Sequence, residues 1–371
     1  MADLEIPTEL RPADGRFGCG PSKVRSEAVS QLAEVADGLL GTSHRKAGVK
    51  GQVRRIREGL TTFFALPDGY EVVLGAGGAT LFWDAAAFGL VRERSAHAVL
   101  GEFSQKFSKV CAGAPHLADP IIVEAPYGSA PELEAVDGVD LYALTHCETS
   151  TGVAMPLRRP EGAEGLVAVD ATSAAGGLAF DIEEVDAYYF SPQKCFASEG
   201  GLFVALLSPA ALARVEELAA SERWIPPMLD LATAVDNSRK DQTYNTPSVS
   251  TLFLMAEQID WMNEGGGIAW AAQQCKAKAD HLYGWAGSRE WARPFVTDPA
   301  LRSNVVCTID LDERVDAGEV SAILRANGIL DTEAYRKLGR NQLRVAVFPA
   351  VDLADVEALT AAVDYVVDAL S

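Results

Sequence analysis

Short apolar runs alternate with segments of helical periodicity over about the first 260 residues of the chain. Each run stops abruptly at a polar residue, a glycine or a proline, which is typical of strands buried inside a parallel sheet. The runs predict strands at 71–74, 98–100, 140–145, 166–169, 187–190 and 202–207, and the periodic segments predict helices at 26–37, 52–64 and 248–263. This alternation indicates an α/β fold with a mainly parallel sheet covered by helices.

A segment of one glutamate and three glycines, 264–267, interrupts the pattern. Beyond it, helices are expected at 268–287, 317–326 and 353–370 and strands at 305–309 and 343–348, which suffice for a second, smaller α/β layer. The 371 residues exceed the length of a typical single domain. We therefore predict a large domain at 16–263 and a small domain formed by 1–15 and 264–371.

The net charge of the chain limits the kinds of molecule that it can bind. With a formal net charge of −20 and a pI of about 4.7, the chain would repel nucleic acids and anionic membranes. No apolar run reaches the roughly 18 residues of a membrane span, the N-terminus lacks signal-peptide features, and the six cysteines show no metal-binding spacing. We expect a reduced, cytoplasmic protein without a metal, in which a few local arginines hold any anionic ligand.

Two polar residues stand where predicted strands end. Asp170 ends the run 166–169, and Lys194 follows the run 187–190. Singly, Lys194 is best explained as a solvated charge and Asp170 as a turn former. Because the carboxyl ends of parallel strands form one crevice, both can face the same small molecule. Pyridoxal phosphate requires such a pair: an amine for a Schiff base and a carboxylate for the pyridine nitrogen.

Other residues would complete a site for that cofactor. The glycine-rich turn 75–80 joins a predicted strand to a predicted helix, so its free N–H groups and the helix dipole suit a phosphate, although a turn without a ligand is equally compatible. Phe103 follows another strand and could stack on a ring, or belong to the core. Thr149 offers a hydroxyl for a ring oxygen, or forms a simple turn.

Cationic side chains near loops are candidates for binding an anionic substrate. His44 and Arg45 are adjacent near the N-terminus, and Arg336 and Arg344 lie in the predicted small domain. Arginine binds carboxylate or phosphate in a bidentate fork, but in so acidic a chain surface ion pairs are the more common role. Arg344 is the strongest candidate, because a charge inside an apolar strand is costly unless an anion meets it.

Taken together, these residues resemble a known family over nearly the whole chain: the phosphoserine aminotransferases, in class V of the fold type I pyridoxal phosphate enzymes. The motifs that carry the resemblance are Gly20-Pro21, Ser43-His44-Arg45, the turn from Gly75 to Thr80, Glu148-Thr149 with Gly152, Asp170, Gln193-Lys194 and Asn245-Thr246-Pro247.

The resemblance implies that Lys194 forms the Schiff base and that Asp170 pairs with the ring nitrogen. It also implies that Phe103 stacks on the ring and that Thr149 bonds the ring hydroxyl. The residues implied to hold the cofactor phosphate are Gly78, Ala79, Thr80 and Gln193, with Asn245 and Thr246 contributed by the partner subunit of a homodimer with shared active sites.

For the substrates, the resemblance implies a ping-pong transamination. L-Glutamate and 3-phosphohydroxypyruvate would give O-phospho-L-serine and 2-oxoglutarate, as in serine biosynthesis. Arg344 would bind the α-carboxylate, near Cys19, while His44, Arg45 and Arg336 would receive the phosphate or the side-chain carboxylate. One cluster of cations suits both substrates because charge is the property that they share.

The chain also departs from the family pattern. The glycine turn lacks a common arginine, so the phosphate would depend on backbone N–H groups and the Thr80 hydroxyl. Cys19 stands where serine is common, and Tyr335 stands where histidine is common. Alternative functions are another class V aminotransferase, such as a serine–glyoxylate or alanine–glyoxylate enzyme, and a non-catalytic binding protein of the same fold. Phosphohydroxythreonine, a substrate in pyridoxine biosynthesis, stays open as an alternative to phosphoserine.

Overall fold

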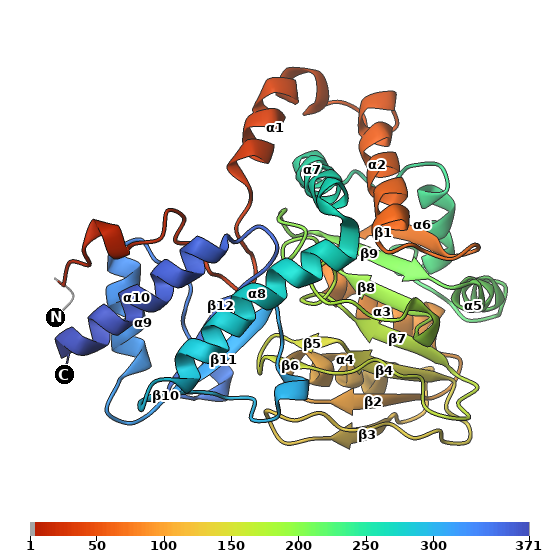
Figure 1. Ribbon diagram of the computed structural model, residues 1–371. Coiled ribbons are helices and arrows are strands. Elements are labelled where there is room, and N and C mark those ends of the chain that lie inside the picture. The colour runs from red at the N-terminus through yellow and green to blue at the C-terminus, as the bar shows by residue number, and fades with distance from the viewer. Residues whose placement is uncertain (1–3, 371) are drawn as a thin grey trace.

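A seven-stranded sheet lies at the centre of the larger part of the molecule (Figure 1). The structure is a computed structural model that describes residues 4–370. The strands of the sheet are β1 (Glu71–Ala76), β2 (Ser95–Val99), β3 (Ile121–Glu124), β4 (Leu141–Thr145), β7 (Leu166–Asp170), β8 (Ala187–Phe190) and β9 (Leu202–Leu207), in the order β1-β9-β8-β7-β4-β2-β3. β9 alone is reversed in direction, and the other six strands all point the same way. The predicted α/β class with a mainly parallel sheet is therefore confirmed.

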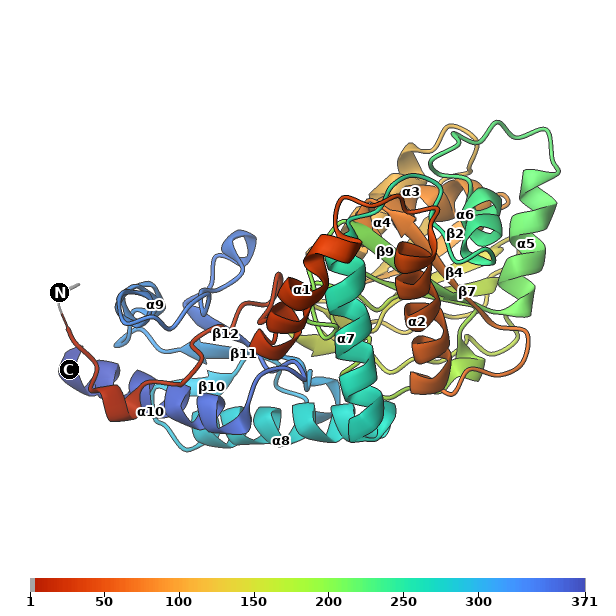
Figure 2. The same ribbon diagram turned by 90° about the horizontal axis from the view of Figure 1, so that it is seen from above.

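Helices cover both faces of this sheet, and strand alternation explains why. Along β8, Tyr188 and Phe190 join the core beneath one helical layer, while Ala187 and Tyr189 join the core beneath the other. The first layer is α2 (Ala47–Phe63) and α7 (Val249–Gly265), which lie side by side in Figure 2. The second layer is α3 (Gly78–Gly89), α4 (Glu102–Gly113), α5 (Pro209–Ala219) and α6 (Leu231–Ser238). Burial on both faces gives the continuous apolar runs seen in the sequence.

A second sheet lies beside the first, with its own apolar core. It consists of the antiparallel strands β10 (Ala292–Pro294), β11 (Val306–Leu311) and β12 (Gln342–Ala346), and its helices are α8 (Gly267–Gly287), α9 (Ala317–Ala326) and α10 (Leu353–Leu370). Ile6 and Phe17, near the N-terminus, are buried in this core. The expected break at 264–267 is a single turn between α7 and α8, where Gly266 has a φ of 123°. The domain limits proposed from the sequence stay a prediction.

Several elements were missed or only partly predicted from the sequence, and β2, predicted only at 98–100, shows the reason. Its first residues include Ser95 and His97, which are buried but polar, so the apolar run was too short to mark the whole strand. Burial is tolerated because the Ser95 Oγ and His97 Nε2 atoms form a hydrogen bond of 2.9 Å. Other elements not predicted are β3, α4, α5, α6, β10, the last residues of the projecting helix α1 (Ser26–Leu39) and the hairpin of β5 (Cys147–Glu148) and β6 (Val153–Ala154).

None of the helices between residues 4 and 370 is both long enough and apolar enough to cross a membrane.

Candidate active site

Asp170 and Lys194 lie at the same edge of the large sheet. Strands β7 and β8 are parallel neighbours, with Asp170 opposite Tyr189, and Lys194 follows the end of β8 closely. Both residues line one cavity of about 280 Å³. Of the residues predicted for the site, those lining this cavity are Gly78, Ala79, Thr80, Phe103, Thr149, Asp170, Gln193 and Lys194. The parallel order of the strands therefore brings together residues that are far apart in the sequence.

The Lys194 amine is buried and has uncharged hydrogen-bond partners. Its Nζ donates to the Cys19 carbonyl oxygen at 2.5 Å, to Ser173 Oγ at 3.2 Å and to Thr149 Oγ1 at 3.5 Å. Burial lowers the pKa of Lys194, and the Arg344 guanidinium acts in the same direction. A lowered pKa increases the neutral fraction of the amine, which is the nucleophilic form.

Gly20 makes room for this lysine. A Cβ atom on Gly20 would lie 2.5 Å from Lys194 Cε, and the φ of 136° at Gly20 is one that residues with side chains rarely adopt. The Gly20-Pro21 motif thus has a local physical reason, because only glycine leaves space for the amine at this position.

The Asp170 carboxylate is held from two sides. Its Oδ2 accepts a hydrogen bond from Trp83 Nε1 at 3.1 Å, and its Oδ1 accepts one from the Thr172 backbone N–H at 2.9 Å. Burial raises the pKa of Asp170, whereas the Thr172 and Trp83 donors and the Lys194 charge oppose that shift. A cationic nitrogen entering the cavity would find this carboxylate already oriented.

The glycine turn after β1 forms a polar cradle at the start of α3. Gly77 and Gly78 have φ values of 99° and 73°, and the Ala79 N–H donates to Ser191 Oγ at 2.6 Å. The buried Oε1 of Gln193 has no hydrogen-bond partner within the described chain. A helix N-terminus with free N–H groups beside the Ser191 hydroxyl matches the needs of a phosphate, whereas the unpaired Gln193 Oε1 is itself an acceptor and needs a donor. Ser191 was missed in the sequence, because a serine after a strand has no distinguishing pattern.

Arg344 reaches the same region from the second sheet. It lies on β12, and its Nη1 donates to the Thr149 carbonyl oxygen at 3.1 Å. The buried Nε of Arg344 has no partner among residues 4–370. The Tyr335 ring lies 5.3 Å from its guanidinium carbon and 5.9 Å from the Phe103 ring. Arg344 therefore keeps donors for a further anion.

Cys19 and Arg336 differ from Arg344 in their placement. The Cys19 carbonyl oxygen accepts a hydrogen bond from the Lys194 amine. The Cys19 thiol sulfur lies 3.8 Å from the Arg344 carbonyl oxygen, and Cys19 is not among the residues that line the cavity. Arg336 begins the 3-10 turn Arg336–Leu338 and does not line the cavity.

A second group of predicted residues clusters away from Lys194. The His44 ring lies against Thr246, with Nδ1 and Oγ1 3.1 Å apart, and Arg45 Nη2 donates to the Tyr244 carbonyl oxygen at 3.1 Å. The Lys194 cavity of the same chain is not lined by any of these residues, nor by the adjacent Asn245: His44, Arg45, Thr246 and Asn245 all lie outside it. The structure thus divides the predicted residues into two groups.

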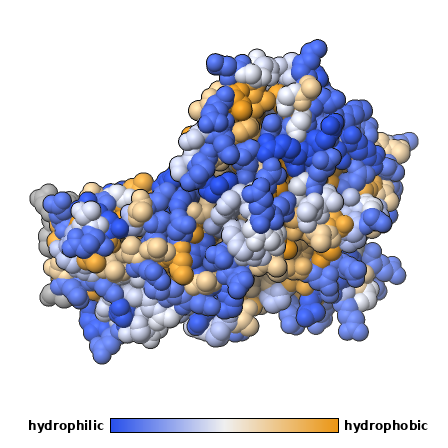
Figure 3. Space-filling view, turned by 45° about the horizontal axis from the view of Figure 1, so that its top comes forward, coloured by the Kyte–Doolittle hydropathy of each residue, from blue (hydrophilic) through white to orange (hydrophobic). Residues whose placement is uncertain are grey.

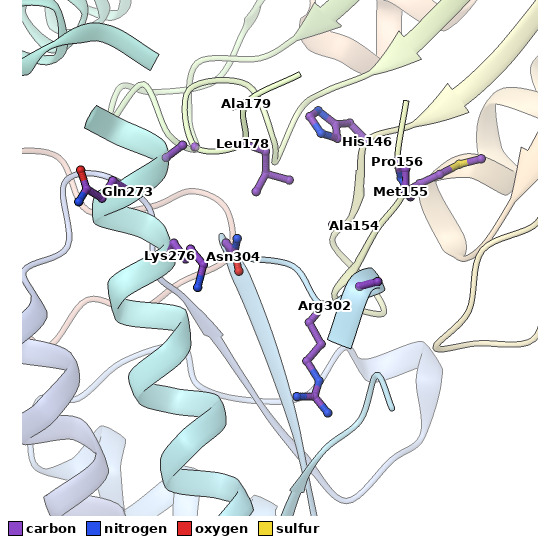
Figure 4. A pocket seen from close by; sticks show the side chains of 13 residues that line it. His146, Ala154, Met155, Pro156, Leu178, Ala179, Gln273, Lys276, Arg302 and Asn304 are labelled. Atoms are coloured by element: carbon purple, nitrogen blue, oxygen red, sulfur yellow. The ribbon is translucent and has the colours of Figure 1, made fainter. Parts of the chain in front are cut away.

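A larger cavity of about 440 Å³ lies between the β5–β6 hairpin and α8, but it lacks an amine and acid pair suited to the same chemistry (Figure 4). Its cations already have partners: Lys276 pairs with Asp280, and Arg302 donates to the Val296 carbonyl oxygen. Burial lowers the pKa of His146 to about 3, so its ring is neutral near pH 7. Residues 4–370 also contain no cluster of His, Cys, Asp and Glu suited to a metal ion.

The buried amine makes the stability of the ligand-free protein depend on pH. Because the folded pKa of Lys194 lies below its ordinary value of 10.5, the unfolded state binds more protons between the two values. The free energy of unfolding should therefore rise with pH in that window, relative to Lys194→Met. Denaturant titrations of both proteins from about pH 7.5 to about pH 10 measure this difference. A difference that stays constant would contradict the lowered pKa.

Comparison with known proteins gives consistent matches. The aminotransferase class-V family model matches residues 131–332. A phosphoserine aminotransferase of Rhodococcus opacus is 58% identical over 98% of both chains. The solved phosphoserine aminotransferase of Cytophaga hutchinsonii has a TM-score of 0.87 at 25% identity, covering 95% of this chain and 99% of that one. One from Trichomonas vaginalis, solved with pyridoxal phosphate bound, shares the fold with a TM-score of 0.82 at 19% identity, covering 95% of this chain and 99% of that one.

Proposed function

Because the chain belongs to the phosphoserine aminotransferases of aminotransferase class V, we infer that it exchanges the amino group between L-glutamate and 3-phosphohydroxypyruvate. The products are 2-oxoglutarate and O-phospho-L-serine, so the reaction serves serine biosynthesis. The observation that carries this conclusion is the full-length identity to named phosphoserine aminotransferases, together with the amine and acid that line one cavity. A cytoplasmic location is a further proposal, supported by six free, buried thiols.

The cavity fits pyridoxal phosphate, the cofactor of this family. The N-terminus of α3 suits the phosphate, the NH₂ group of Gln193 would be a side-chain donor to it, and the oriented Asp170 carboxylate suits the pyridine nitrogen. We assign Lys194 to the aldehyde, Thr149 to the ring hydroxyl and Phe103 to the ring face, because all three line the cavity and Thr149 lies close to the Lys194 amine. When bound, the cofactor supplies an aldehyde that captures amines covalently and a ring that accepts an electron pair.

The residues of the chain would supply binding and proton transfer. Arg344 holds the substrate carboxylate with its remaining donors, which orients the Cα–H bond toward Lys194. The Lys194 amine, whose lowered pKa favours its neutral form, would remove the proton from Cα. Within that half-reaction the amine would pass the proton on to the cofactor carbon that carried the aldehyde, and in the second half it would move a proton from that carbon to Cα of the product, so that Lys194 ends each half neutral.

We propose that the second cluster acts in a partner subunit. His44, Arg45, Asn245 and Thr246 lie together away from the Lys194 cavity of their own chain. Apolar surface is exposed nearby. The exposed residues are Val29 and Val35 on the projecting α1, Leu40 just after it, Trp224 and Met228 in the loop before α6, and Tyr244 after α6. Figure 3 shows apolar atoms gathered on the upper lobe of the molecule. A homodimer would bury this surface and bring each cluster to the other subunit's cavity.

Subunit complementation tests this arrangement. Lys194→Ala and Arg45→Ala are each expected to be nearly inactive as homodimers. If Arg45 acts in the partner's site, a mixed dimer contains one intact site, so co-expressed chains should recover about a quarter of the wild-type activity. If Arg45 acts in its own chain, every site of the mixed dimer is damaged and no activity returns. Light scattering on the purified protein measures the dimer mass independently.

Substrate choice tests the reaction itself. With L-glutamate as donor, turnover of 3-phosphohydroxypyruvate should exceed that of the unphosphorylated ketoacid. The unphosphorylated ketoacid has no phosphate to pair with the cationic side chains proposed to bind that group. Phosphoserine should likewise exceed serine in the reverse direction, as measured by formation of L-glutamate. If serine as donor and glyoxylate as acceptor were turned over as fast as phosphoserine, the enzyme would instead be a glyoxylate aminotransferase.

A further inference from the structure

We propose that Glu148 is a positioning residue that fixes Phe103 relative to Thr149, two residues that line the cofactor cavity. The inference rests on the proposed function and extends it to a residue with no role in the reaction as described above. Glu148 is the last residue of β5 and directly precedes Thr149, and its side chain is fully buried. It does not line the cavity, so any effect on the cofactor must pass through its neighbours.

The Glu148 carboxylate joins two separate parts of the chain. On one side, its Oε2 accepts hydrogen bonds from the backbone N–H groups of Phe103 at 3.1 Å and Ser104 at 3.0 Å, and from Ser104 Oγ at 3.0 Å. On the other side, its Oε1 accepts from Ser150 N–H at 3.2 Å and Ser150 Oγ at 2.6 Å. All these donors are uncharged. The carboxylate therefore binds the first turn of α4 to the loop that carries Thr149.

Two residues of the proposed site, Phe103 and Thr149, depend on that connection. Phe103 is placed through its own N–H group. Thr149, the residue after Glu148, lies with its Oγ1 3.5 Å from Lys194 Nζ and its carbonyl oxygen 3.1 Å from Arg344 Nη1. A ring held between Phe103 and the opposite wall requires a fixed spacing, because stacking weakens quickly as the gap opens.

The fit around Glu148 leaves little freedom. A Cβ atom at Gly101, the residue before α4, would lie 2.4 Å from Glu148 Cγ. Only a carboxylate accepts hydrogen bonds with both oxygens. A glutamine here must turn its NH₂ group either toward the N–H groups of Phe103 and Ser104 or toward that of Ser150. In both orientations donors face each other, so the first turn of α4 is expected to shift.

The experiment is a double-mutant cycle on the full-length protein, with the cofactor removed and then titrated back. The quantity measured is the dissociation constant of pyridoxal phosphate, from quenching of tryptophan fluorescence. Glu148→Gln should raise that constant about tenfold or more, but by less than about threefold when Phe103 is already alanine. The visible circular dichroism of the bound cofactor, which reports ring orientation, should weaken in Glu148→Gln.

Asp186→Asn is the matched control. Asp186 is also a buried carboxylate, and it accepts hydrogen bonds from the Val167 N–H, Ser208 Oγ and Arg159 Nη2, but it lies at the opposite end of β8. Its loss should lower the melting temperature and leave cofactor affinity within about twofold. A purely structural role for Glu148 would give the same result as this control, and would overturn the proposal.

The outcomes separate the two levels of inference. If Phe103→Ala and Lys194→Ala both leave cofactor affinity unchanged, the proposed cofactor site is wrong and the positioning role falls with it. If both weaken binding but the effects of Glu148→Gln and Phe103→Ala simply add, only the positioning role is wrong. Should Glu148→Gln not fold, Ser104→Ala takes its place in the cycle. That variant removes one donor to the carboxylate, and additivity with Phe103→Ala would again contradict the proposal.

Discussion

Replacing Lys194 by alanine is expected to lower kcat about 10⁴-fold or more while the protein stays folded. The change removes both the nucleophilic amine and the group that moves the substrate proton, and each contributes strongly to the rate. Folding should tolerate the change, because the buried amine has a lowered pKa and no carboxylate hydrogen-bonded to it. The measurement is the steady-state rate with L-glutamate and 3-phosphohydroxypyruvate, together with the visible absorbance of the bound cofactor.

Lys278 provides the matched control for Lys194. It is also a buried lysine, but its Nζ donates to the carbonyl oxygens of Phe348 and Val351, both at 2.7 Å, behind the small sheet. Lys278→Met should cost stability and leave most of the turnover. Full activity in Lys194→Ala would remove the central assignment, and equal losses in both variants would point to a folding defect.

Asp170→Asn should lower kcat by about 10²-fold to nearly 10⁴-fold. A buried charge that loses its partner costs about 3–5 kcal/mol, and each 1.36 kcal/mol changes a rate tenfold. Asparagine is nearly isosteric, so the contacts with Trp83 and the Thr172 N–H can be partly kept while the negative charge is lost. Cofactor should still bind, because Lys194 and the phosphate cradle are unchanged. Single-turnover kinetics with L-glutamate isolate the proton-transfer step.

Trp83→Phe separates the charge of Asp170 from its orientation. It removes one donor to Oδ2 and keeps the carboxylate. The expected loss is about tenfold, in line with a single hydrogen bond to a charged group. If Asp170→Asn were as active as wild type, the proposed pairing of this carboxylate with the ring nitrogen would be wrong.

Part of the site follows from local pattern. A strand buried on both faces must end where its apolar run ends, so the apolar runs alone identify Asp170 and Lys194 as strand-end residues. The glycines of the 75–80 turn are recognisable for the same kind of reason, since a sharp strand-to-helix turn needs positive φ.

Other parts could not be read from pattern. Ser173 and Ser191, which contact Lys194 and the Ala79 N–H, are ordinary serines in the sequence. Glu148 belongs to a recognisable motif but had no predicted role, because its partners Phe103 and Ser104 precede it by more than forty residues. The elements α4 and β2 were missed or cut short where buried polar residues broke the apolar runs.

The sequence by itself determined the α/β class, the strand ends and the candidate amine and acid, because these depend on which residues can be buried next to one another along the chain. Only the tertiary structure decided which cations converge. It placed Arg344 against Thr149, 195 positions away, and left His44 and Arg45 beside Thr246 and Tyr244. Distant contacts arise from the packing of whole sheets and helices against each other, and no local pattern encodes that packing.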